Sequence, residues 1–241
     1  FEFFKRAIRD PHPRVRLEAL HGLRALGGAR SAKLAMEAYS ESMDDVFEFG
    51  LWRTMEALEE DWFEEAEKDP LLFGQDTRKL VYAIKCLNHT EALSPLIALW
   101  KEGGVSQNAV LPALQLMGEL GDDSVLALVF EAAVQIDNEG GSGSSEILDA
   151  LLRASGRGER GPKVSVADVE ALLKSDEEGV RIRTAELAGV WNVSGVIGRL
   201  EALAGNPDTE EKLADAAVEG LARMRSNEAG PALNRLVSDR N

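Results

Sequence analysis

One stretch decides the fold: residues 10–27, DPHPRVRLEALHGLRALG. Its two prolines form a turn, an amphipathic run follows, and Gly27 ends that run. Apolar residues recur in the run at the spacing of one helix face. These residues are Val15, Ala19, Leu20, Leu23 and Leu26. We therefore predict one helix with this face buried and a turn at each end.

Helix ends of this kind recur along the chain. The predicted ends at Gly27, Gly121, Gly156, Asn192 and Arg225 are separated by 94, 35, 36 and 33 residues, and 94 is about three times 31. A period in the low to middle thirties that consists of helix pairs is typical of an α-solenoid. Because no strand alternation is found, we predict an all-α chain of about seven helix pairs, the first of them incomplete.

Residues 10–27 match the form Asp-x4-Val-Arg-x2-Ala-x2-Gly-Leu-x2-Leu-Gly, which resembles the HEAT repeat. Residues 178–185 (EGVRIRTA) and 213–221 (LADAAVEGL) look like further copies, the last without its arginine. The resemblance implies a single right-handed α-solenoid over residues 1–241. It also implies that Asp10 and Arg16 belong to an ionic ladder between neighbouring turns, which is a structural role.

A narrower resemblance is carried by residues 44–58 (DDVFEFGLWRTMEAL) and 76–84 (DTRKLVYAI). They look like the HEAT region of planctomycete and verrucomicrobial membrane-bound dehydrogenase-like proteins. That resemblance implies a β-propeller upstream, a c-type cytochrome downstream and a location outside the cytoplasm. The chain begins in what reads as the middle of a helix and has no initiator Met, so we expect a piece of a longer protein. The residues themselves leave the compartment open.

Composition excludes several classes of protein. The 241 residues are 44% hydrophobic, which is enough for a sizeable core. A formal net charge of −15 opposes binding to phosphate backbones, so we expect no nucleic-acid partner. No apolar run approaches the ~18 residues of a membrane span, so we expect a soluble chain without membrane insertion. The single cysteine excludes an internal disulfide and a four-thiolate metal site.

Motifs for chemistry are incomplete. Cys86 and His89 form the second half of a haem-attachment motif that lacks its first cysteine, so we predict a buried, inert thiol. His12 and His21 are nine residues apart, too far to chelate one zinc ion as an i, i+4 pair does. The Gly/Ser-rich residues 138–146 predict a flexible loop that either hinges two halves or joins two helices. We predict no catalytic residue, cofactor or metal ion.

The favoured function is a non-catalytic scaffold that binds other proteins or neighbouring domains of its own chain. The acidic residues 56–69 are interpreted as a solvated helix face, with a basic partner or a hard cation as alternatives. We expect contacts on the second helix of each pair, above all within residues 47–78. The candidate binding residues are Arg14, Trp52, Arg53, Arg78, Gln107 and Arg181.

The alternative function is an enzyme, or an accessory domain of one, on the same scaffold. HEAT-like folds include a bilin lyase family and a DNA-alkylation glycosylase family. The glycosylase family needs a basic groove, which the net charge of −15 disfavours.

Overall fold

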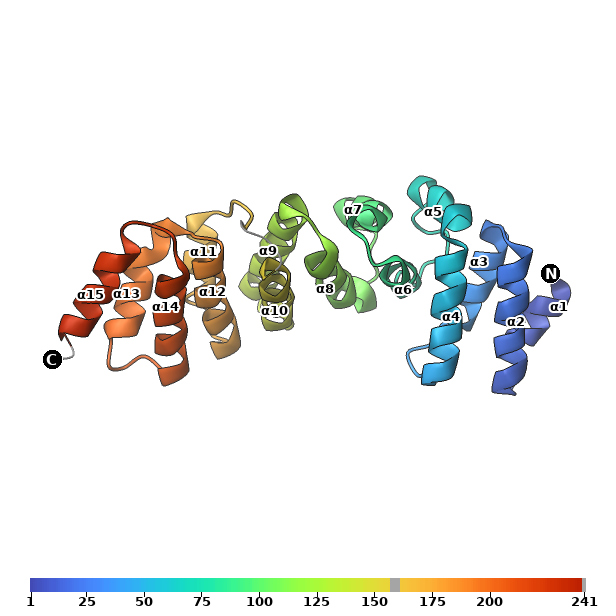
Figure 1. Ribbon diagram of the computed structural model, residues 1–241, viewed down its shortest axis with the longest axis horizontal. Coiled ribbons are helices and arrows are strands. Elements are labelled where there is room, and N and C mark those ends of the chain that lie inside the picture. Colours follow the sequence, from blue (N-terminus) through green and yellow to red (C-terminus); the bar gives the residue numbers. More distant parts are fainter. Residues whose placement is uncertain (157–160, 240–241) are drawn as a thin grey trace. The chain divides into compact units, whose positions relative to one another are not determined.

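The computed structural model describes residues 1–156 and 161–239 of the chain (Figure 1). These residues form fifteen α-helices joined by loops and short 3-10 turns, with no β-strand among them. Contacts divide the chain into two compact units, residues 1–113 and 114–241, and the division falls inside α8 (Val110–Leu120). The all-α prediction is confirmed, and each unit is described below by itself.

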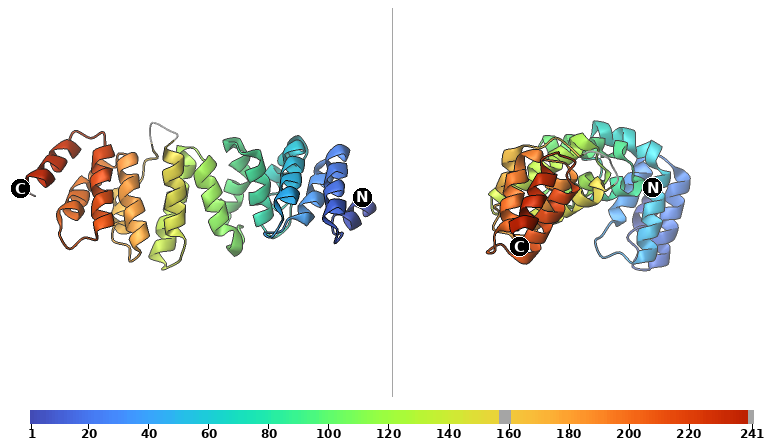
Figure 2. Two further views of the ribbon diagram at one scale, coloured as in Figure 1. Left: turned by 60° about the horizontal axis from the view of Figure 1, so that its bottom comes forward. Right: turned by 60° about the vertical axis from the view of Figure 1, so that its left-hand side comes forward.

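Unit 1 consists of two rows of helices (Figures 1 and 2). In one row α2 packs on α4 and α4 packs on α6, while in the other α3 packs on α5 and α5 packs on α7. Contacts of α2 with α3 and of α4 with α5 join the rows. The bounds are α1 (Glu2–Ala7), α2 (Pro13–Leu26), α3 (Ala29–Ala35), α4 (Asp45–Ala57), α5 (Glu59–Lys68), α6 (Arg78–Leu87) and α7 (Ser94–Lys101).

Unit 2 has the same two-row arrangement. One row runs from α10 through α12 to α14, and the other contains α9, α11, α13 and α15. The bounds are α9 (Asp123–Asn138), α10 (Ser144–Ser155), α11 (Val166–Leu172), α12 (Glu178–Val190), α13 (Ile197–Gly205), α14 (Glu211–Arg223) and α15 (Ala229–Asp239). Along the chain, the ends of α2, α4, α6 and α8 follow one another at 31, 30 and 33 residues, in agreement with the predicted interval.

Local sequence explains where several helices begin and end. The Asp44 carboxylate accepts a hydrogen bond from the Phe47 amide at 2.9 Å and so caps the start of α4. Asp122 caps α9 in the same way through the amides of Ser124 and Val125. After α2, Gly27 adopts φ 74°, a conformation that favours glycine and lets the chain turn into α3.

The predicted apolar face of α2 is only partly buried. Ala19, Leu20 and Leu23 are buried, but Val15 is 39% exposed and Leu26 is 52% exposed. Val15 borders an open hollow between α1 and α2, and Leu26 lies in the last turn before the chain reverses. The prediction that these two residues are buried is wrong, because neighbouring helices cover only the middle of α2.

Two arginines close the turns that precede their helices. Arg16 Nη1 donates to the backbone oxygens of Asp10 (3.0 Å) and Pro11 (3.3 Å), and Arg181 Nη1 donates to those of Ser175 (2.7 Å) and Asp176 (3.2 Å). In each case the two carbonyls lie six and five residues before the arginine in the chain. The structure therefore differs from the expected ionic ladder at Arg16. This arginine binds the Asp10 carbonyl, and the Asp10 carboxylate accepts from the His12 amide.

The Gly/Ser-rich loop joins two packed helices, α9 and α10, within unit 2. The amides of Gly140 and Gly141 donate to the carbonyls of Asp137 and Ile136, which is the Schellman arrangement at a helix end. Ser144 is buried and its hydroxyl donates to the Ala133 carbonyl at 3.2 Å. The loop therefore connects two helices that pack on each other.

Candidate functional site

Three of the six predicted binding residues form ion pairs within the chain, and two of them, Arg78 and Arg181, are linked to other elements in this way. Arg78 on α6 binds Asp76 through two hydrogen bonds of 2.9 and 2.8 Å and binds Glu41 at 2.7 Å. The bonds with Asp76 and Glu41 raise the pKa of the Arg78 guanidinium, and the same bond with Arg78 lowers the pKa of Asp76. Arg181, in unit 2, pairs with Glu210 at 2.8 Å and is only 16% exposed. Both side chains are structural links in the present geometry.

Arg14 and Gln107 are exposed and lie apart from these ion pairs. Arg14 is in the first turn of α2 and lines two shallow hollows, one on each side of that helix. Gln107 lies in a 3-10 turn, Gln107–Ala109, directly before α8. Arg14, Trp52, Arg53 and Arg78 therefore lie on α2, α4 and α6, which form one row of unit 1. Gln107 precedes α8, and Arg181 belongs to unit 2.

Trp52 and Arg53 lie on the solvent side of α4. Trp52 is 43% exposed, and its Nε1 donates to the Cys86 carbonyl at the end of α6 (3.0 Å). Arg53 pairs with Glu56 one turn along the same helix. The indole is thus anchored at one edge while its ring faces solvent, which suits a side chain that takes part in binding.

Helix α4 carries a second apolar stripe that the sequence reasoning missed. Its inner stripe is buried and consists of Phe47, Leu51, Met55 and Leu58. On the opposite side, Val46 is 66% exposed and Phe49 is 62% exposed, and Trp52 continues the line. We call Val46, Phe49 and Trp52 the outer stripe. Its three-residue spacing, in a helix whose inner stripe is already complete, is the signal that could have found it.

A hollow of about 290 Å³ adjoins the outer stripe, between the first turns of α2 and α4. Leu17, Val46 and Phe47 supply its apolar wall, and Arg14 and Asp44 stand at its rim. The two helices approach closely at this point, because Leu17 Cδ1 lies 2.4 Å from the place that a Cβ on Gly50 would take. A second hollow of about 340 Å³, between α1 and α2, is lined by Phe3 and Val15 among others.

Charge is distributed unevenly over unit 1. Residues 1–40 contain eight basic and four acidic residues, whereas residues 41–69 contain twelve acidic and two basic residues. Around the start of α4, Asp44 and Asp45 are exposed and Glu48 is half-buried. The outer stripe therefore begins in an acidic surrounding.

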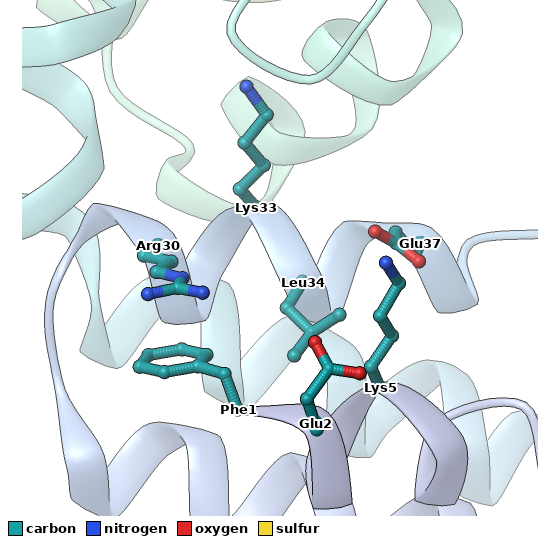
Figure 3. A pocket seen from close by; sticks show the side chains of 7 residues that line it. All are labelled: Phe1, Glu2, Lys5, Arg30, Lys33, Leu34 and Glu37. Atoms are coloured by element: carbon teal, nitrogen blue, oxygen red, sulfur yellow. The ribbon is translucent and has the colours of Figure 1, made fainter.

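A third hollow, of about 190 Å³ between α1 and α3, has the opposite character (Figure 3). Arg30 lies over the ring of Phe1 at 4.1 Å from its centre, and Lys33 extends away from that ring. Lys5 is a further cation of the lining, and Glu2 and Glu37 supply carboxylates. Arg9 pairs with Glu37 beside it. This hollow is basic, whereas the start of α4 is acidic.

The acidic helix α5 is exposed on most of its surface, but three of its carboxylates bind other elements. Asp61 accepts from the Gly28 amide at 2.8 Å, Glu59 binds His89 Nε2 at 2.8 Å and Glu67 accepts from the Ser94 hydroxyl at 2.9 Å. Trp62 is fully buried on the other side. These carboxylates link neighbouring helices, a role that composition alone does not reveal.

The single thiol is buried, as predicted. Cys86 is 5% exposed on α6, and burial raises its pKa to about 12. A thiol with that pKa is protonated at neutral pH and is a poor nucleophile.

Among residues 1–156 and 161–239, no group of three or more His, Cys, Asp or Glu side chains is placed to hold a metal ion. Within the same residues, no helix is both long and apolar enough to cross a bilayer. No protein-family model matches the chain, and a search of the curated proteins finds no relative. The outer stripe and its hollow are therefore argued from geometry alone.

Proposed function

We propose that the chain is a right-handed, HEAT-like α-solenoid of about seven helix pairs that binds other proteins and catalyses no reaction itself. The two-row packing within each unit and the helix-end intervals of 30 to 35 residues support the fold. Hydrogen bonds span similar intervals: Trp52 on α4 donates to Cys86 on α6, 34 residues away, and the Arg225 amide after α14 donates to the Asn192 side chain after α12, 33 residues away.

The observation that carries the function is the outer stripe. A helix of a two-row protein needs one buried face, and α4 already has one. An exposed Phe and a half-exposed Trp on its other side add apolar area in contact with water, which favours covering by a partner. Trp and Arg, which stand together here as Trp52 and Arg53, are enriched among residues that dominate binding energies. The partner is a separate protein or a neighbouring domain of the same chain.

The test compares three purified baits in a lysate of the source organism. Wild type and the Val237→Ser variant, which alters a valine of α15 that is 65% exposed, should retain the same proteins. Phe49→Ser should lose at least one of them. The protein that is lost is then purified, and titration calorimetry should give an affinity at least about tenfold weaker for Phe49→Ser. Equal affinity for all three baits, or no retained protein, would contradict the proposal.

The narrower resemblance to dehydrogenase-like proteins remains a prediction. Reading the gene on both sides of this segment checks it directly, because that family implies a β-propeller before the segment and a Cys-x-x-Cys-His motif after it.

A further inference from the structure

We infer that the outer stripe binds a basic amphipathic helix, with the basic end of that helix over the start of α4. This inference rests on the proposed function and specifies the chemistry of the partner. Three features of unit 1 carry it: the spacing of the stripe, the apolar hollow beside it and the charges at its two ends.

The spacing fits a helix of two to three turns. Val46 and Trp52 are six residues apart, which is about 9 Å along α4. Apolar residues at positions i, i+3 or i+4, and i+7 of a partner helix cover about the same length. An extended segment fits less well, because the backbone groups of α4 are already bonded within the helix. A strand laid on apolar side chains would leave its own amides and carbonyls unpaired, whereas a helix satisfies them internally.

The hollow provides a place for one anchoring side chain. Its wall is apolar and formed by Leu17, Val46 and Phe47, at the junction of α2 and α4. Asp44 stands at the rim, where its carboxylate is already fixed by the Phe47 amide. A leucine or phenylalanine of the partner would lose water contact there, and a lysine or arginine beside it would reach the rim carboxylate.

The charges set the direction of the partner. At the Val46 end, Asp44 and Asp45 are exposed and Glu48 is half-buried, and Arg14 is a cation that lines the same hollow as Asp44. At the Trp52 end the balance is different. Arg53 is paired with Glu56, and the exposed Lys85 directly precedes the Cys86 carbonyl that Trp52 binds. Positive side chains of the partner are therefore attracted to the start of α4, and the attraction at its end is small.

The same charges disfavour two other occupants. A nucleic acid or an anionic membrane would bring negative charge to a region in which residues 41–69 carry twelve acidic and two basic residues. A second copy of the chain is a distinct alternative, because the basic hollow of α1 and α3 is one surface that an acidic region attracts (Figure 3). The test below measures whether two copies of the chain associate.

The test uses three fluorescent peptides of equal length and the full chain. The first has leucines on one helical face and lysines elsewhere, the second replaces every lysine by glutamate, and the third is the first with a central proline. Fluorescence anisotropy at physiological salt should give a dissociation constant on the order of 10 μM for the basic peptide. The acidic and proline peptides should bind at least about tenfold more weakly.

Matched variants locate the binding. Phe49→Ser should weaken the basic peptide at least about tenfold, while Val237→Ser leaves its affinity unchanged. Asp45→Lys, in the first turn of α4, should weaken it about threefold or more. Glu211→Lys makes the same kind of change in the first turn of α14, in the other unit, and should have no comparable effect. An effect of equal size from both lysine variants would mean that only net charge attracts the peptide.

Each other outcome overturns the inference in an identifiable way. If the acidic or the proline peptide binds as well as the basic one and loses affinity in Phe49→Ser, the partner class is wrong while the proposed binding surface stands. If no peptide binds, or Phe49→Ser has no effect, the inference fails and the bait experiment decides the proposed function independently. A dimer in sedimentation velocity that Phe49→Ser dissociates would make a second copy the occupant.

Discussion

Replacing Gly189 by alanine should destabilise unit 2 by about 2 kcal/mol, although alanine is the better helix former. Gly189 lies on α12 against α14. A Cβ there would lie 2.4 Å from the Gly220 carbonyl oxygen and 2.6 Å from its Cα. Ordinary van der Waals contact begins at 3.4 Å, so the two helices must separate by about 1 Å at this point.

The magnitude follows from two opposing effects. Because the obstacle is backbone and not the end of a flexible side chain, we take the upper part of the overpacking range, about 3 kcal/mol. The higher helix propensity of alanine offsets about 1 kcal/mol of this. Gly198→Ala is the matched control on α13, since nothing lies within 4 Å of its added Cβ, and we expect it to be stabilising by about 0.5 kcal/mol.

Urea unfolding followed by circular dichroism measures both variants. With an m value of about 2 to 3 kcal/mol/M, Gly189→Ala should lower the midpoint of the transition that belongs to unit 2 by about 0.7 to 1 M. Hydrogen exchange of α12 and α14 amides assigns that transition, because the two units need not unfold together. If Gly189→Ala is as stable as Gly198→Ala, the close contact between the backbones of α12 and α14 is refuted.

Three further predictions concern single groups. Asp44→Ala removes the cap of α4 and should cost about 1 kcal/mol, measured as a lower urea midpoint; an unchanged midpoint would show that the bond to the Phe47 amide contributes nothing. The buried Cys86 thiol, with its pKa raised to about 12, should react with a thiol reagent far more slowly in the folded chain than in urea, and equal rates would refute its burial. The bond from Arg78 lowers the pKa of Asp76 below its ordinary 3.8, so the stabilisation it supplies is complete above that pH and lost as the pH falls through the lower, folded value. Asp76→Asn should therefore lower the urea midpoint at pH 7, and the difference from wild type should shrink at pH 3; a difference that is constant with pH would argue against this ion pair.

Most helices could be predicted from the sequence because their signals are local. The buried inner stripe of α4 and the buried residues Val180, Leu187 and Trp191 at the other end of the chain follow from helical spacing. The cap by Asp44 follows from the preference for aspartate at a helix start. Such signals lie within a few residues of one another, so they can be read without knowing the packing.

The candidate site was predicted only in part. Trp52 and Arg53 were predicted as contact residues because an adjacent Trp and Arg are typical of binding surfaces. Val46 and Phe49 were missed, since an apolar residue is expected in a core until neighbouring helices show otherwise. Arg78 was predicted as a contact residue because it lies on the second helix of a predicted pair, whereas its carboxylate partner Glu41 is 37 residues away. A sequence pattern does not reveal contacts across that separation.

The sequence by itself determined an all-helical chain with a period near 33 residues, because periodicity and capping act over a few residues. Only the tertiary structure decided which apolar stripes stay in water and which arginines are bound internally. It also decided where two helices touch backbone to backbone, as at Gly189 and Gly220. The reason is geometric. These properties depend on the approach of helices about one period apart, which is set by the packing of whole side-chain surfaces and not by any local signal.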